Sequence, residues 1–130
     1  MRPSDRKYLK SHEWAKIEGD FVVIGISDFA VNQLSDITHI DLPEVGDNIT
    51  KGEPLGEIES VKTVSDIISA VTGEVVEVNE GLTEEENFTL LTESAFDNGW
   101  LIKVKAENLA DLDDALDATA YEVVVKEESE

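Results

Sequence analysis

Apolar and polar residues alternate in short runs near the start of the chain, a pattern that predicts strands joined by tight turns. Residues 14–18 and 21–26 are two such runs, and Gly19 and Asp20 separate them, which is typical of a β-hairpin. The second run is almost entirely apolar. We therefore expect that strand to be buried on both of its faces.

A short helix is expected directly after this hairpin. Ser27 and Asp28 supply side-chain oxygens that can cap a helix, and residues 29–34 follow them. Within that run, Ala30 and Leu34 share one helical face.

The middle of the chain is rich in β-branched residues, which favours strands over helices. The expected strands cover residues 37–42, 54–61, 63–69 and 73–79. A weak repeat also lies here, because residues 45–49 resemble residues 72–76, and each is followed by a further glycine, Gly52 or Gly81. Two related halves are expected to pack as a sandwich.

The last third adds one strand, at residues 99–104, and one amphipathic helix. The apolar stripe of that helix consists of Leu109, Leu112, Leu116 and Ala120. The acidic run 84–86 is expected to be a solvated loop or helix start, and residues 127–130 a frayed tail. The predicted fold class is α+β, mainly β.

The length of 130 residues suits a single domain, 1–130, with a packed core. Ten basic residues against 30 acidic ones give a net charge of -20. Such a chain repels phosphate backbones and anionic lipids, so nucleic acid and membrane are not expected as partners. The absence of cysteine excludes disulfides, thiolate nucleophiles, Cys-type zinc sites and Cys-ligated iron–sulfur clusters.

The chain has no apolar run of membrane-spanning length, and its first six residues lack the apolar core of a secretory signal. We therefore expect a cytoplasmic protein. A mature organellar form with an added Met, located in the mitochondrial matrix, would have the same beginning.

One lysine is conspicuous. Lys62 is the only basic residue between Lys51 and Lys103, and it lies at the junction of two expected strands, at an exposed hairpin tip. Its ordinary interpretation is a solvated side chain. A Schiff-base lysine needs burial or a cationic neighbour, whereas Glu59 and Asp66 surround Lys62 with negative charge. An amide-linked carrier arm, which needs an exposed amine on a rigid tip, suits this environment better.

Several segments, in order from about residue 7 to residue 123, resemble the H-protein family of the glycine cleavage system. They are SHEW (11–14), GISDFA (25–30), LSDI (34–37), DLPEVG (41–46), ESVKTVSD (59–66), GEVVEVN (73–79) and GWL (99–101). The resemblance implies a lipoyl-domain-like barrel-sandwich hybrid with short flanking helices and a C-terminal helix. It leaves residues 124–130 as an acidic tail.

The resemblance also implies a function. Lys62 matches the family's lipoylated lysine, so the expected cofactor is lipoate in amide linkage. The chain would then be a carrier protein rather than an enzyme. It would take the aminomethyl group from glycine decarboxylase (P protein) to an aminomethyltransferase (T protein), and dihydrolipoamide dehydrogenase (L protein) would reoxidise it. A lipoyl-attaching enzyme is a fourth expected partner, and visits to several partners favour a monomer.

By the same resemblance, the loaded arm docks against Ser11, Glu13 and Asp66. Both carboxylates have the right charge for an ammonium group. Alternatives stay open: Glu13 as a solvated carboxylate at a strand start, and Asp66 as a flanking residue that the lipoyl-attaching enzyme recognises. His12 and His39 lack the spacing of a metal site, and no metal is expected.

The chain departs from the family pattern at Ala70, where a proline is common, and over residues 82–96. These changes lie away from Lys62, and they concern the loop surface that meets partners or covers the arm.

Four other functions remain as alternatives. The first is a lipoyl relay that donates lipoate to other proteins without glycine turnover, and the second is an unmodified binding module. A biotin carrier fits less well, because methionine typically flanks the biotinyl lysine and Met1 is the only methionine here. An independent enzyme fits least, since the sequence shows no nucleophile–base pair or phosphate-binding glycine loop.

Overall fold

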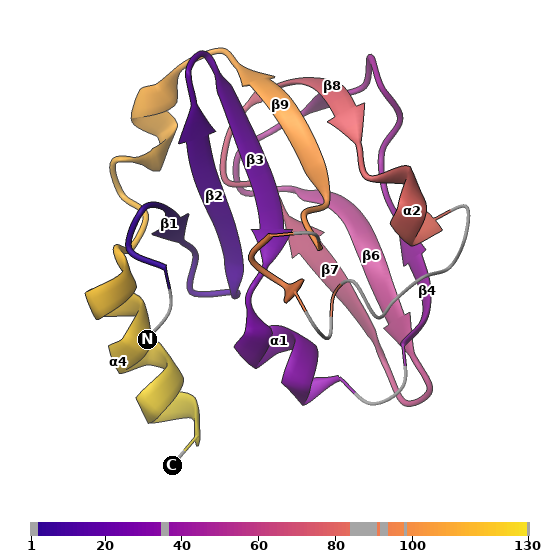
Figure 1. Ribbon diagram of the computed structural model, residues 1–130, viewed down its shortest axis with the longest axis vertical. Coiled ribbons are helices and arrows are strands. Elements are labelled where there is room, and N and C mark those ends of the chain that lie inside the picture. The colour runs from indigo at the N-terminus through magenta and orange to yellow at the C-terminus, as the bar shows by residue number, and fades with distance from the viewer. Residues whose placement is uncertain (1–2, 35–36, 84–90, 92–93, 98, 130) are drawn as a thin grey trace.

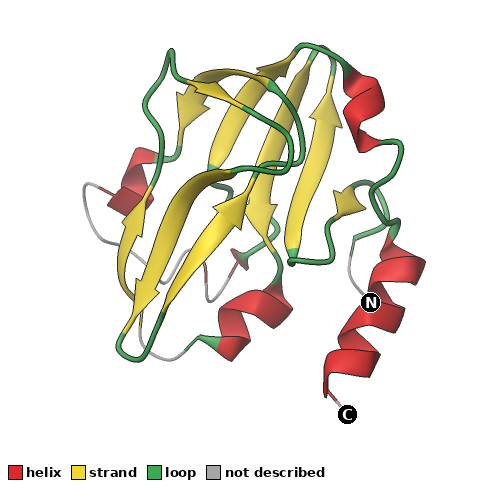
Figure 2. Ribbon diagram, turned by 180° about the vertical axis from the view of Figure 1, so that it is seen from behind, coloured by secondary structure: helices red, strands yellow, loops and turns green. Residues whose placement is uncertain are grey.

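Two antiparallel sheets face each other in the computed structural model, which describes residues 3–34, 37–83, 91, 94–97 and 99–129 (Figures 1 and 2). The larger sheet has the order β1-β2-β3-β9-β8-β5 and the smaller one β4-β6-β7. Their bounds are Lys7–Tyr8 (β1), Glu13–Glu18 (β2), Phe21–Ile26 (β3), Ile37–Asp41 (β4), Asn48–Ile49 (β5), Pro54–Ser60 (β6), Val64–Ile68 (β7), Gly73–Val78 (β8) and Ile102–Ala106 (β9). The prediction of a mainly β fold is confirmed.

The first hairpin forms as the sequence predicts. Strands β2 and β3 pair from Glu13 opposite Ile26 to Glu18 opposite Phe21, and Gly19 makes the turn with φ +65°. Strand β3 is buried from Val22 onward, as expected, because Val22, Ile24 and Ile26 pack in the main core on one face and Val23 packs in a second apolar cluster on the other.

Helix α1 (Asp28–Gln33) begins at the predicted cap. The Ser27 hydroxyl accepts a hydrogen bond from the Ala30 backbone N–H at 3.3 Å. A second short helix, α2 (Glu80–Thr83), follows β8. The acidic run 84–86 and most of residues 82–96 lie outside the described residues.

The internal repeat brings its own two copies together. Strands β5 and β8 pair with Asn48 opposite Glu74 and Ile49 opposite Gly73. A Cβ atom at Gly73 would lie 2.3 Å from the Lys105 carbonyl oxygen on β9, so glycine allows the close approach of these strands.

The main core lies between the sheets. Both contribute fully buried aliphatic residues, such as Ile24 and Ile102 from the larger sheet and Ile40 and Ile67 from the smaller one. Burial of this apolar surface is the main stabilising term of the fold.

A second cluster attaches the C-terminal helix to the outer face of the larger sheet. Its buried members are Tyr8, Trp14, Val23, Ala118 and Tyr121, and the Tyr8 and Tyr121 rings stack with centroids 4.6 Å apart. A Cβ atom at Gly25 would lie 2.5 Å from the Trp14 ring, so only glycine fits there.

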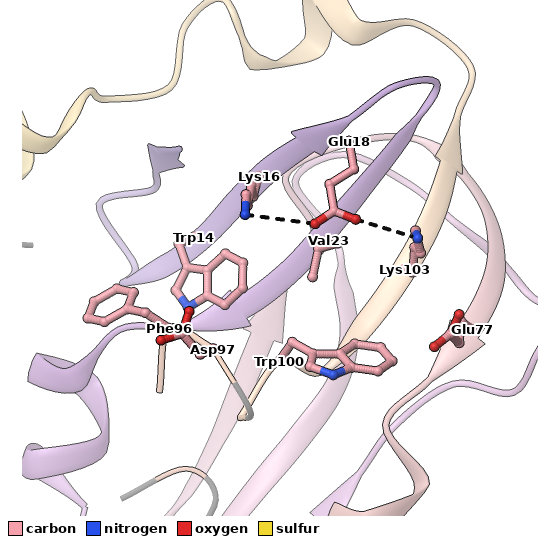
Figure 3. Close-up of a pocket in the computed structure, with 9 residues that line it drawn as sticks. All are labelled: Trp14, Lys16, Glu18, Val23, Glu77, Phe96, Asp97, Trp100 and Lys103. Carbon is pink, nitrogen blue, oxygen red and sulfur yellow. Dashed lines mark ion pairs between the residues drawn. The ribbon is translucent and has the colours of Figure 1, made fainter. Parts of the chain in front are cut away.

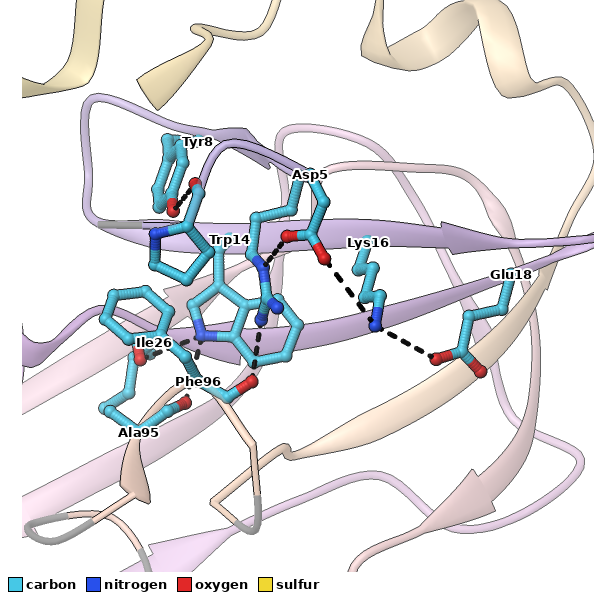
Figure 4. Close-up of polar contacts among 10 residues, drawn as sticks. Asp5, Tyr8, Trp14, Lys16, Glu18, Ile26, Ala95 and Phe96 are labelled. Atoms are coloured by element: carbon cyan, nitrogen blue, oxygen red, sulfur yellow. Dashed lines mark hydrogen bonds and ion pairs between the residues drawn. The ribbon is translucent and has the colours of Figure 1, made fainter. Parts of the chain in front are cut away.

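Polar contacts fix Trp14 in this cluster (Figure 4). Its indole N–H donates to the carbonyls of Ile26 and Ala95, each at 3.1 Å. The guanidinium of Arg6 lies 4.6 Å above the ring and donates to the Phe96 carbonyl at 2.7 Å. These contacts bring the chain start against residues 95 and 96.

The predicted C-terminal helix is wrong at its beginning. Leu109–Leu112 forms a separate 3₁₀ helix, and Leu116 pairs with Tyr8 through two backbone hydrogen bonds of 2.7 and 2.8 Å. Helix α4 begins only at Ala118 and continues to Ser129, so the expected tail is helical to that residue. The long-range pairing with Tyr8 takes the backbone groups that a continuous helix would have used.

One further boundary differs. The last strand begins at Ile102 rather than at residue 99. No described helix is long and apolar enough to cross a membrane.

Candidate functional site

Lys62 lies at the tip of the β6–β7 hairpin, as the sequence predicts (Figures 1 and 2). The turn is closed by the Ser60 N–H, which donates to the Thr63 carbonyl at 2.8 Å, and by the Thr63 N–H, which donates to the Ser60 hydroxyl at 3.3 Å. Residues 61–66 are exposed. The hairpin therefore presents the Lys62 side chain to solvent from a fixed backbone.

The surroundings of Lys62 are acidic. Glu57 and Asp66 lie directly opposite each other on β6 and β7, and Glu59 pairs with Val64 nearer the tip. Within the part of the chain that the structure describes, the Lys62 ammonium makes no ion pair or hydrogen bond. An exposed and unpaired amine is what a modifying enzyme needs.

A cavity of about 200 Å³ lies between β7, helix α1 and the turn from β1 to β2, and we call it the β7–α1 cavity. Its apolar lining comes from Ile26, Phe29, Ala30, Leu34, Ile58 and Ile67. Its polar lining comes from Ser11, His12, Glu13, Gln33, Ser65, Asp66 and Glu128. The structure thus brings together Ser11, Glu13 and Asp66, the three residues that the sequence analysis expected to share a site.

Glu13 is the buried member of this group, with 2% of its surface exposed. One carboxylate oxygen accepts from the Ser11 hydroxyl at 2.5 Å, and the other accepts from the Ile68 N–H at 2.8 Å. Burial raises the pKa of Glu13, while the bonds from Ile68 and Ser11 oppose that rise. The alternative of a solvated carboxylate at a strand start is therefore wrong, because Glu13 connects the two sheets.

Asp66 is exposed on β7, the strand that follows the turn with Lys62. The Asp66 side chain lines the β7–α1 cavity. The cavity therefore begins on the strand that follows Lys62.

A network around His12, not predicted from the sequence, lies beside these residues. Its Nδ1 lies 2.7 Å from the Tyr121 hydroxyl, and its Nε2 lies 3.0 Å from a carboxylate oxygen of Glu128. Both partners belong to α4, more than a hundred residues along the chain. The sequence held no signal for these contacts beyond the position of His12 between two expected site residues.

No group of three or more His, Asp or Glu side chains in the described ranges is placed to hold a metal ion. His12 belongs to no such group, and its ring nitrogens contact Tyr121 and Glu128.

A larger cavity, of about 380 Å³, lies on the outer face of the six-stranded sheet and is lined in part by Trp14 and Trp100 (Figure 3). Three of its charged groups pair with one another, since Glu18 lies 3.9 Å from Lys16 and 3.5 Å from Lys103. This cavity does not include any of the predicted site residues.

Comparisons with known proteins agree with this geometry. The sequence model of the family described as glycine cleavage H-protein matches residues 6–128. Proteins named glycine cleavage system H protein are 44% identical over 125 residues in Geobacillus kaustophilus and 45% identical over 127 residues in Thermus thermophilus. The alignments cover 96% of this chain and 97% of the first relative, and 98% of this chain and 98% of the second.

A solved structure shows the same arrangement. The crystal structure of a glycine cleavage system H protein from Mycobacterium marinum superposes with a TM-score of 0.82 at 36% sequence identity. The match covers 92% of this chain and 95% of that one. The predicted lipoyl-domain-like barrel-sandwich hybrid with flanking helices is confirmed.

Proposed function

Because this chain belongs to the glycine cleavage H-protein family, we propose that it is the lipoylated carrier protein of a glycine cleavage system. In this role it receives the aminomethyl group at the P protein, delivers it to the T protein and is reoxidised by the L protein. It is a carrier component and contributes positioning rather than catalysis.

The observation that carries the proposal is the exposure and placement of the Lys62 side chain. Its amine is exposed and lies on a hairpin tip whose backbone is fixed by the Ser60–Thr63 hydrogen bonds. These features fit covalent attachment of lipoate, since the amine is accessible and the attachment point is rigid. Once attached to Lys62 by an amide, lipoate supplies a disulfide, the sulfur chemistry that a chain without cysteine lacks.

The β7–α1 cavity suits the cargo. An aminomethyl group ends in an amine that is cationic when protonated, and Glu13 and Asp66 both line the cavity. The Glu13 carboxylate has about four lone-pair positions, and Ser11 and Ile68 use two contacts. It can therefore accept a further hydrogen bond from an ammonium group.

The electrostatics of Glu13 favour the same cargo. Burial raises the pKa of Glu13, so its ionised form is costly. An ammonium group in the cavity would offset that cost and favour the ionised form. The apolar residues of the lining would at the same time keep water away from the labile cargo.

Intact-mass measurement after co-expression with a lipoyl-attaching enzyme tests the attachment. The wild-type chain is expected to gain one lipoyl adduct, and Lys62→Arg is expected to gain none. Lys105→Arg is the matched control, because Lys105 is also an exposed lysine but lies on β9, away from the hairpin tip, and it should keep the adduct. An unmodified wild-type chain, or an adduct that survives Lys62→Arg, would overturn the assignment.

A further inference from the structure

We propose that His12 is a positioning residue that latches the end of helix α4 onto the wall of the β7–α1 cavity. The inference rests on the proposed function for the identity of what enters the cavity, namely the loaded arm. The latch itself consists of contacts among residues of this chain.

The backbone of His12 is unusual. It has φ +84°, the only positive value among the described residues that are not glycine. Hydrogen bonds hold it on both sides, since its N–H donates to the Leu9 carbonyl at 2.9 Å and its carbonyl accepts from the Ser27 N–H at 2.8 Å. This conformation directs the imidazole toward α4, whereas the neighbouring Ser11 and Glu13 bond to each other.

The imidazole joins two helices. A carboxylate only accepts hydrogen bonds, so the Nε2–H group of His12 donates to Glu128 at 3.0 Å. Its Nδ1 contacts the Tyr121 hydroxyl, which also lies 2.5 Å from the Ser27 hydroxyl at the start of α1. The His12 ring packs against Phe29 of α1, with centroids 4.9 Å apart. His12 thus connects α4 to the wall of the cavity that α1 forms.

The latch holds the part of α4 that apolar packing does not reach. Tyr121 is fully buried, and Val124 and Val125 pack against the same cluster. Val125 is the last residue of α4 for which the described part of the chain shows packing against this cluster. Glu128 lies almost one turn further on, exposed on its outer side and lining the cavity. The His12–Glu128 bond therefore sets where the last turn lies relative to the cavity.

A docked arm would meet this last turn as part of its enclosure. If the bond to His12 is lost, the turn carrying Glu128 is free to fray, as helix ends do. Water then reaches the cavity more often and hydrolyses the aminomethyl group sooner: its C–S and C–N bonds break, and one water yields the free thiol, formaldehyde and ammonia.

Four variants isolate the latch. His12→Asn introduces a residue that tolerates positive φ, but its shorter side chain cannot reach Glu128 to form the hydrogen bond. Glu128→Ala removes the acceptor, Glu128→Gln keeps one, and Glu127→Ala is the matched control. Glu127 is exposed on the same helix and does not line the cavity, so Glu127→Ala removes the same charge elsewhere on α4.

Amide hydrogen exchange on the unlipoylated protein provides the first readout. Protection of the last turn of α4 should fall about threefold in His12→Asn and Glu128→Ala, the effect of losing one partly exposed charged hydrogen bond. Glu128→Gln and Glu127→Ala should stay close to wild type. Equal protection in all five proteins would overturn the latch.

The lifetime of the cargo provides the second readout. Each lipoylated protein is loaded with glycine by purified P protein and separated from it, and ammonia release is followed over time. Release should be about threefold faster from His12→Asn and Glu128→Ala than from the other three, in proportion to the lost protection.

The outcomes separate the two proposals. If native loaded wild type releases ammonia as fast as the same protein unfolded in urea, docking in the cavity is wrong and the coupling to α4 falls with it. If wild type protects its cargo and all variants protect it equally, the carrier function stands and the latch is wrong.

Discussion

Replacing Glu13 by Gln should stabilise the protein at neutral pH and at the same time weaken its hold on a cationic cargo. A Gln side chain can accept from the Ile68 N–H and donate to the Ser11 hydroxyl, so both hydrogen bonds of Glu13 have a counterpart. What disappears is the buried charge. The variant therefore separates the structural contribution of this side chain from its electrostatic one.

The magnitude follows from the pKa of Glu13, which burial raises above its ordinary value of 4.5. The unfolded chain then loses this proton at lower pH than the folded protein does. The contribution of Glu13 to the free energy of unfolding is fully present below pH 4.5 and falls as pH rises through the raised pKa. Within that interval the loss is about 1.4 kcal/mol per pH unit.

Urea unfolding of wild type and Glu13→Gln measures this difference. The pH range runs from about 4 to about 8, so that it includes both the ordinary pKa of Glu and neutral pH. The free energy of unfolding of the variant minus that of wild type should grow from pH 4.5 upward and then level off. Other titrating groups are the same in both proteins and cancel. Parallel curves, or a difference that shrinks with pH, would refute the assignment of a raised pKa to Glu13.

Glu13→Ala provides the contrast. It leaves the Ile68 N–H without its side-chain acceptor and removes the link between the two sheets. Loss of a partly buried hydrogen-bond partner costs about 1–3 kcal/mol. A melting temperature lower than that of Glu13→Gln by several degrees is therefore expected, and equal melting temperatures would contradict the bridging role.

Three further predictions concern the fold and its charge. Gly25→Ala should lower the free energy of unfolding by about 1–3 kcal/mol in urea denaturation, because the new Cβ would lie 2.5 Å from the Trp14 ring. Adding Trp14→Phe to the same chain should relieve part of that cost. Strictly additive effects of the two substitutions would contradict the clash. Asp117→Ala should lower the melting temperature by about 4 °C, since its carboxylate accepts from the Ala120 N–H at 2.8 Å at the start of α4; the exposed Asp113→Ala is the control, and equal effects would exclude a capping role. With a net charge of -20, the carrier should associate more slowly with the P and T proteins as salt is added, and salt-independent kinetics would count against electrostatic steering.

Features that depend on neighbouring residues could be predicted from the sequence. The turn at Gly19, the cap at Ser27 and the exposed tip at Lys62 are set by their immediate surroundings, and the structure has all three. Glycine, capping hydroxyls and β-branched runs act over a few residues, so their effects can be inferred from the amino-acid sequence alone.

Features that depend on distant partners could not be predicted in this way. Glu13 is buried because the Ile68 N–H, 55 residues along the chain, supplies a donor inside the molecule. Helix α4 begins late because Leu116 pairs with Tyr8. The contacts of His12 span 109 and 116 residues. In each case tertiary contacts override the local pattern.

The central claim is that this chain carries an aminomethyl group on Lys62, and glycine-dependent exchange of labelled carbon dioxide tests it most directly. Purified P protein is supplied with lipoylated wild type, lipoylated Lys105→Arg or Lys62→Arg as the only carrier. The carrier function predicts exchange with the first two proteins and none with Lys62→Arg. No exchange with fully lipoylated wild type would contradict it and would favour a lipoyl relay instead.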